Sequence, residues 1–92
     1  MDMDKEAIKQ KIRQAGFADL NEYQDPAGTF FSDHKHEGAE LLVVMVGSME
    51  ITMSGQTTKL EVGDEFMFPA GVIHSALVGA SGCTYLVGEA HN

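Results

Sequence analysis

Three of the four histidines in this chain lie in two short clusters whose residue types and spacing suit a metal ion. His34, His36 and Glu40 make up the first cluster, and His74 belongs to the second. A divalent transition metal needs several nitrogen and oxygen donors that meet at one point, and imidazole and carboxylate side chains supply them. These four residues are therefore candidate metal ligands.

Strand geometry allows these side chains to converge. Residues i and i+2 of a β-strand point to the same side, so His34 and His36 can reach one ion together. Glu40 shares that parity if the strand resumes after Gly38. His74 follows Glu40 by 34 residues, which is far enough for the chain to return to the same place.

Length and charge limit the classes of protein to which the chain can belong. Its 92 residues indicate one domain, and a core of that size leaves a small margin of stability that a bound metal or a second copy increases. The formal net charge is −8, and no basic stripe is present to meet phosphates. We therefore expect no nucleic-acid partner. We also expect no membrane partner, because the longest apolar run, residues 41–46, is too short to cross a bilayer.

Cys83 is the single cysteine, so no disulfide can form within the chain. The opening residues do not have the pattern of a signal peptide, and both observations predict a cytoplasmic protein. A lone thiol can be a ligand or a nucleophile, but Cys83 follows a Gly-Ala-Ser-Gly stretch without charged neighbours. We interpret it as a small apolar residue.

The N-terminal segment, about residues 4–15, is predicted to be helical. Ile8, Ile12 and Ala15 recur at helical spacing and form one apolar stripe. Acidic residues lie at the start of the segment and basic residues at its end, which matches the helix dipole, and Gly16 is suited to end the helix. We expect this helix to pack on the outside of the main body, away from the site.

Short strands separated by turn residues are predicted for about residues 28–90. Residues 41–46 form a continuous apolar run, typical of a strand buried on both faces. Residues 49–53 alternate between apolar and polar, typical of a strand with one wet face. The last two strands are expected at residues 72–78 and 84–87, joined by a glycine-containing turn. Short strands at regular turn spacing indicate a β-sandwich or a β-barrel.

Two motifs connect these observations to a known family. The pattern G-x5-H-x-H-x3-E-x6-G is met from Gly28 to Gly47, and the pattern G-x5-P-x-G-x2-H is met from Gly63 to His74. The chain thereby resembles the cupin superfamily, in which the second motif often continues to an Asn where this chain has Val78. That Asn is not a metal ligand in the family, so the departure leaves the site intact.

The resemblance implies an all-β fold, the double-stranded β-helix or jelly-roll barrel, as a single domain over residues 1–92 with a short N-terminal α-helix. It also implies His34, His36, Glu40 and His74 as ligands of a divalent transition metal. Three imidazoles and one carboxylate favour Fe, Mn, Ni, Co, Cu or Zn over Ca or Mg, without choosing among them.

Other polar side chains have simpler interpretations. Glu37 has the opposite parity to the ligands, so we expect it to face solvent. His91 is expected to lie in a frayed tail rather than to bind metal. Tyr85 is interpreted as a packing residue, with a hydrogen bond into the pocket as the alternative.

Strand parity also predicts which apolar side chains face the pocket and which face outward. Alternate residues from Leu42 to Val46 are expected to point inward with the ligands. Leu41, Val43 and Met45 are then expected to form an exposed apolar row. Because a second copy would cover such a row, we predict a homodimer.

Two hypotheses for function follow from a metal site with open coordination positions. The first is a metal-dependent enzyme acting on a small molecule, of the dioxygenase, isomerase, decarboxylase or lyase type, all of which occur among cupins. The alternative is a non-catalytic module that senses a metal or a small ligand. No phosphate-binding loop, basic anchor or separate acid/base pair accompanies the ligands, so metal-centred chemistry on a small substrate is favoured.

Overall fold

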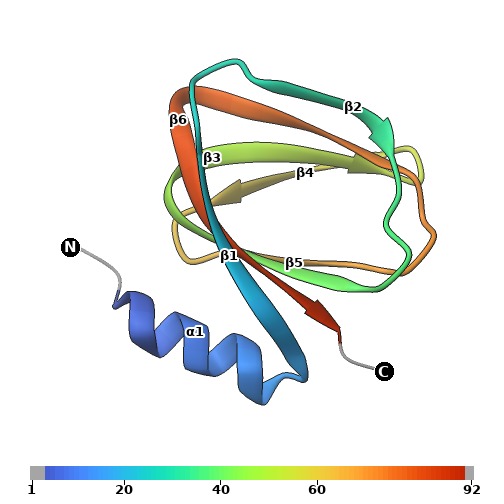
Figure 1. The fold of residues 1–92 in the computed structure, drawn as a ribbon. Coiled ribbons are helices and arrows are strands. Elements are labelled where there is room, and N and C mark those ends of the chain that lie inside the picture. The colour runs from blue at the N-terminus through green and yellow to red at the C-terminus, as the bar shows by residue number, and fades with distance from the viewer. Residues whose placement is uncertain (1–3, 91–92) are drawn as a thin grey trace.

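A computed structural model describes residues 4–90 as one short helix followed by an antiparallel sheet that curls into a barrel (Figure 1). The elements are α1 (Lys5–Gln14), β1 (Phe17–Asp25), β2 (Phe30–His34), β3 (Glu40–Met53), β4 (Gln56–Glu61), β5 (Glu65–Phe68) and β6 (His74–Ala90). The all-β jelly-roll prediction is confirmed. Within the described residues no helix is long and apolar enough to cross a membrane.

Two long strands at the centre of the sheet organise the barrel. β3 and β6 pair with each other over most of their lengths, and each also pairs with two short strands. β3 pairs with β5 through its first half and with β4 through its second half, whereas β6 pairs with β2 first and with β1 later. All of these pairings are antiparallel. The two long strands therefore carry the chain across both walls of the barrel (Figure 1).

The prediction of two separate strands after residue 72 was wrong, because β6 runs without interruption from His74 to Ala90. Gly82 adopts a φ of 78° inside this strand, a value that glycine accommodates without the penalty of a Cβ atom. Opposite it, Gly47 has a φ of 79° and lies so close that a Cβ there would collide with the carbonyl oxygen of Gly82. The glycines allow two long strands to bend together at this point rather than to turn.

β1 was not predicted, because strands were expected only over about residues 28–90. This strand pairs with β6 and carries a register shift between Ala18 and Asn21. Most of its residues are exposed, so it lacks the apolar alternation that reveals a half-buried strand. Backbone pairing with β6 holds it in the sheet, together with the partly buried side chains of Phe17 and Leu20.

The predicted helix is confirmed at α1. The side chain of Asp4 caps its start by accepting hydrogen bonds from the backbone N–H groups of Glu6 and Ala7. Ile8 and Ile12 are buried beneath it, whereas Ala15 is exposed at its C-terminal cap. α1 therefore packs outside the barrel, as expected.

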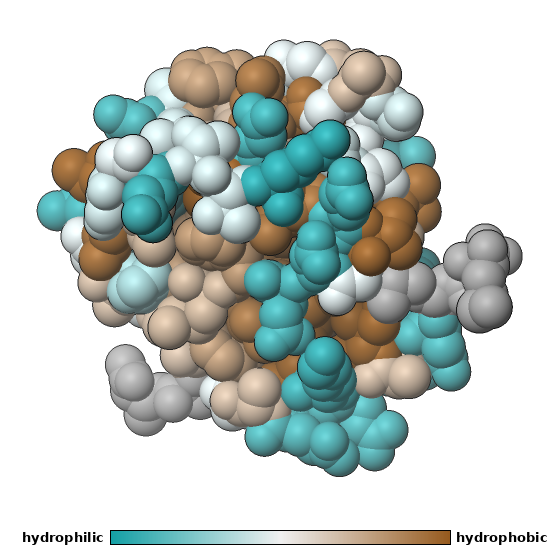
Figure 2. Space-filling model, turned by 180° about the vertical axis from the view of Figure 1, so that it is seen from behind, coloured by the Kyte–Doolittle hydropathy of each residue, from teal (hydrophilic) through white to brown (hydrophobic). Residues whose placement is uncertain are grey.

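The apolar row on β3 that was expected to be exposed is covered by α1. Leu41, Val43 and Met45 form one buried cluster with Ile8 and Ile12. This corrects the sequence argument for a homodimer, because the helix already supplies the cover that a second copy was expected to supply. Viewed from behind, the molecule shows a band of hydrophilic side chains flanked by apolar areas (Figure 2).

The interior of the barrel holds a second buried cluster that includes Leu42, Val44, Met49 and Val78. Val78 is 2% exposed, so the position where the family often has Asn is part of the apolar core here. The expectation that Val46 faces inward was wrong, since its side chain is 59% exposed. A register shift between Val44 and Val46 reverses the parity of the strand at this point.

Candidate metal centre

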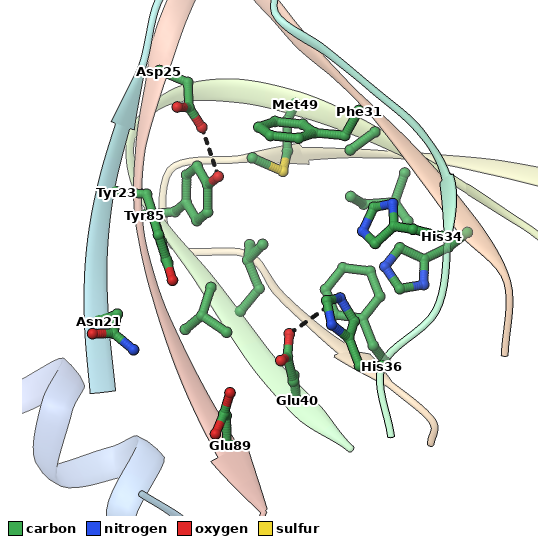
Figure 3. A pocket seen from close by; sticks show the side chains of 16 residues that line it. Asn21, Tyr23, Asp25, Phe31, His34, His36, Glu40, Met49, Tyr85 and Glu89 are labelled. Carbon is green, nitrogen blue, oxygen red and sulfur yellow. Dashed lines mark hydrogen bonds and ion pairs between the residues drawn. The ribbon is translucent and has the colours of Figure 1, made fainter. Parts of the chain in front are cut away.

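The imidazoles of His34, His36 and His74 converge at one wall of the barrel interior (Figure 3). Each offers one ring nitrogen, and these nitrogens all lie within 4.8 Å of one another. His34 ends β2 and His74 begins β6, and the two are direct partners across these strands. His36 follows in the next loop, where its carbonyl oxygen accepts a 2.8 Å hydrogen bond from the N–H of Gly71. This bond joins the loop of the first motif to the turn of the second.

Two of the imidazoles are oriented by backbone carbonyls two residues earlier in the chain. Nδ1 of His34 lies 2.6 Å from the carbonyl oxygen of Ser32, and Nδ1 of His74 lies 3.1 Å from that of Val72. Because a carbonyl only accepts, Nδ1 carries the proton in both rings and Nε2 is left with its lone pair. This is the arrangement that metal-binding histidines use to fix their tautomer.

Glu40 lies beside this group of histidines at the start of β3. Its Oε1 is 3.5 Å from Nε2 of His36, and its side chain is 14% exposed. Burial raises the pKa of Glu40, and nearby Glu89 raises it too, whereas His36 and His34 act in the opposite direction. A cation placed among these groups would stabilise the charged carboxylate.

An apolar wall closes the other side of the histidines. The ring of Phe68 packs on His74 with the ring centroids 4.2 Å apart, and Phe66 packs behind Phe68 at 4.9 Å. His74 is 3% exposed. Burial lowers the pKa of His74, and the neighbouring histidines lower it further, while the hydrogen bond to Val72 raises it. His74 is therefore held as the neutral imidazole that metal binding requires.

The donor set and its geometry fit a transition metal. Ligand atoms about 2.1 Å from one ion lie roughly 3 to 4 Å from each other, depending on the angle between them. The nitrogens of the three imidazoles lie within 4.8 Å of one another, and Glu40 Oε1 lies 3.5 Å from His36 Nε2, distances close to that spacing. Imidazole nitrogen suits the later first-row metals and not Ca or Mg. Three histidines thus lie close enough to hold one metal ion.

The histidines line a cavity of about 290 Å³ inside the barrel (Figure 3). The wall opposite them comes from β1 and the last part of β6. It carries the polar side chains of Asn21, Tyr23, Asp25 and Tyr85, and at its far end that of Glu89, the strand partner of Glu40. Of these, only Tyr85 was considered from the sequence. Asn21, Tyr23 and Asp25 follow the i, i+2, i+4 spacing of one strand face. This spacing has meaning only in a strand, and β1 was not predicted.

A hydrogen bond joins two members of the opposite wall. The hydroxyl of Tyr85 donates to Oδ2 of Asp25 over 2.6 Å, a short distance typical of a charge-assisted bond. Burial and the neighbouring Asp25 raise the pKa of Tyr85 above its usual range, so its hydroxyl keeps its proton. The interpretation of Tyr85 as a packing residue was incomplete, because its polar end also lines the cavity.

The remaining candidates from the sequence lie away from the histidines. Glu37 is exposed, as predicted. Cys83 is buried in the core, which confirms its interpretation as a small apolar residue, and burial raises the pKa of its thiol to about 11. The predicted frayed tail at His91 lies outside the described residues.

A jelly-roll barrel with a cluster of histidines inside it is the arrangement expected from the resemblance to cupins. The family model described as "Cupin domain" matches residues 22–86, which is more than half of the chain. The chain therefore belongs to the cupin family. No curated protein sequence matches it.

Solved structures agree with this assignment at the level of the fold. KdgF from Halomonas sp. is 20% identical with a TM-score of 0.69, and the match covers 79% of this chain and 69% of that one. A cupin-2 domain protein from Shewanella frigidimarina is 23% identical with a TM-score of 0.68, covering 78% and 69%. The DMSP lyase DddQ from Ruegeria pomeroyi is 24% identical with a TM-score of 0.73, covering 79% of this chain and 38% of the lyase.

Proposed function

We propose that this cupin is a metal-dependent enzyme that acts on a small molecule, with His34, His36, Glu40 and His74 as the metal ligands. The observation that carries the proposal is the convergence of three imidazoles inside a cavity that also presents polar groups on its far wall. The reaction classes that suit such a site are dioxygenase, isomerase, decarboxylase and lyase. The likeness to a structure described as a DMSP lyase is consistent with this range.

When bound, a divalent metal supplies a Lewis acid with coordination positions open to a substrate. The protein's own residues supply the rest. Backbone carbonyls hold the protons of His34 and His74 on Nδ1 and leave Nε2 free. Phe68 excludes water from one side of the imidazoles. Across the cavity, Tyr85 retains its proton and directs it toward Asp25.

Elemental analysis of protein purified without chelator tests the metal site. We expect about one transition-metal ion per chain, and a large loss of metal in His36→Ala and His74→Ala, since each removes one donor. Lys35→Ala is the matched control, because Lys35 lies between two of the ligands but is exposed. Equal occupancy in all three variants would contradict the assignment of the ligands.

A second measurement separates an enzyme from a binding module. Once the metal is known, the loaded protein is screened with small molecules for oxygen consumption, isomerisation, decarboxylation and elimination. Turnover that is lost with the metal supports the enzyme. Metal-dependent binding of a small molecule without turnover favours the alternative, a sensing module.

We also propose that the protein is cytoplasmic. This proposal is supported by its single cysteine, Cys83, which is free and buried.

A further inference from the structure

The wall opposite the histidines offers hydrogen-bond acceptors to a ligand. A tyrosine hydroxyl has one proton and two lone pairs, and Tyr85 already donates its proton to Asp25. Its oxygen therefore can only accept a further hydrogen bond from a bound molecule. The carboxylate of Asp25 accepts as well. A ligand group that donates hydrogen bonds matches this end of the cavity.

The same wall is negatively charged and is not neutralised by the protein. Among the described residues, no lysine or arginine lines the cavity, and neither Asp25 nor Glu89 forms an ion pair. The ion pairs of the lysines lie elsewhere, for example between Lys5 and Glu22 and between Lys11 and Glu65. Because a carboxylate in a partly enclosed site is stabilised by a cation, the ligand is expected to bring one.

Two aromatic rings reinforce this preference. Tyr23 and Tyr85 are stacked, with ring centroids 5.4 Å apart and an angle of 28° between their planes. Both point into the cavity from the neighbouring strands β1 and β6 (Figure 3). Because the rings stack on each other, only the outer faces of the pair are left to attract a cation, and this attraction grows when the cation leaves water.

We propose that the Asp25–Tyr85 end of the cavity, with Tyr23 beside it, binds the primary ammonium group of a small amine. The three N–H donors of an ammonium group match the lone pairs of Asp25 and Tyr85. The other end of the amine, an oxygen donor such as a carboxylate, faces the histidines. The inference rests on the proposed function for that second contact only. At about 290 Å³, the cavity is at the lower end for small-molecule sites, so the amine is small.

Three probes of the same chain length test the ammonium preference by isothermal titration calorimetry. 4-Aminobutanoate carries an ammonium group, butanoate carries none, and 4-(trimethylammonio)butanoate carries a cation without N–H donors. We expect 4-aminobutanoate to bind about tenfold or more tightly than butanoate, as one charge-assisted hydrogen bond allows. We expect the trimethylammonium compound to bind more weakly than 4-aminobutanoate, because it cannot donate to Asp25 or Tyr85. Equal binding of all three, or no binding of 4-aminobutanoate, would overturn the proposal.

Substitutions at the wall locate the preference. Asp25→Asn removes the charge, and Tyr85→Phe removes the acceptor oxygen while keeping the ring. Each is expected to weaken 4-aminobutanoate about tenfold and to leave butanoate unchanged. Glu50→Gln is the control, because it removes an exposed carboxylate on β3 that does not line the cavity. If Asp25→Asn fails to fold, which circular dichroism shows, Tyr85→Phe and the probe comparison still decide. An unchanged preference in the folded variants counts against this location.

Metal content separates failure of this inference from failure of the proposed function. Each titration is run on metal-loaded and chelated protein whose metal is measured by elemental analysis. Protein that holds metal but shows no preference for 4-aminobutanoate overturns the ammonium site and leaves the metal centre standing. Protein that takes up no metal on loading but prefers 4-aminobutanoate overturns the metal centre and supports the ammonium site.

Discussion

Cys83 shows how burial controls the chemistry of a single side chain in this barrel. Its thiol is 4% exposed, and burial, aided by the charge of Asp25, raises its pKa to about 11. Only about one thiol in a thousand is then ionised at pH 8, and the thiolate is the reactive form. We predict that iodoacetamide alkylates Cys83 far more slowly in the folded protein than in urea, as measured by mass spectrometry. Equal rates in the two states would contradict its burial.

The candidate site divides into a part that the sequence predicts and a part that it does not. His34 and His74 are oriented by carbonyls two residues earlier in the chain, from β2 and from the turn before β6, so local spacing carries the information needed to find them. The bond between Tyr85 and Asp25 joins residues 60 positions apart. That contact depends on the pairing of β1 with β6, which no local pattern in the sequence reveals.

Among the elements, the strand predictions were wrong where backbone pairing outweighs the side-chain pattern. β1 is mostly exposed and polar, so periodicity does not identify it. β6 contains Gly79 and Gly82, which were interpreted as a turn but allow a strand to pass close to its neighbours. The register shift before Val46 reverses parity without any signal in a run of apolar residues. The helix was predicted correctly because its stripe and its caps are local.

The bend shared by β3 and β6 predicts a large effect of Gly47→Ala. Both Gly47 and Gly55 have positive φ, at 79° and 78°, so alanine strains either by about 1 to 2 kcal/mol. Only at Gly47 does the added Cβ also collide with the backbone of Gly82, whereas the space around Gly55 is open. We predict that urea denaturation shows a clearly larger loss of stability for Gly47→Ala. Equal losses would mean that the bend does not need this close approach.

The contact between α1 and the barrel predicts a stability role for Ile12. This side chain is fully buried and lies against Gly88, where a Cβ would collide with it. Ile12→Ala leaves a cavity and is expected to cost about 2 to 5 kcal/mol in the free energy of unfolding. Gln10→Ala, on the exposed side of the same helix, is the control. The metal content of folded Ile12→Ala should be unchanged, because α1 does not line the cavity, and a loss of metal would contradict this separation.

The homodimer stays a prediction, but it no longer rests on the apolar row of β3. The row on β3 is covered by α1, but other large apolar side chains are exposed, among them Phe30 at 63% and Ile73 at 57%. A second copy that covers such side chains adds stability to a small domain. Light scattering at micromolar concentration checks this expectation. A single species of 10.0 kDa would show that the chain is a monomer.

A metal held by the three histidines would link the stability of the whole barrel to pH. Metal binding needs neutral imidazoles, whose ordinary pKa is about 6.5, so protons compete for three ligands at once as pH falls below that value. The lowered pKa of His74 adds to this effect, because the unfolded chain takes up that proton before the folded chain does. Glu40 has the opposite sign, since its raised pKa favours the folded state at acidic pH, but only nearer to its ordinary value of 4.5.

We therefore predict that metal-linked stability is present at pH 7 to 8 and is lost through about pH 6 to 5. A metal at 100 times its dissociation constant adds about 2.7 kcal/mol to the free energy of unfolding, and this increment should vanish across that window. Metal-free protein should change less, because no metal is lost and the contribution of the lowered pKa of His74 is partly opposed by that of Glu40. Melting curves of metal-loaded and chelated protein from pH 5 to 8 measure the difference. A gap between the two melting temperatures that stays constant over the whole range would mean that histidines do not bind the metal.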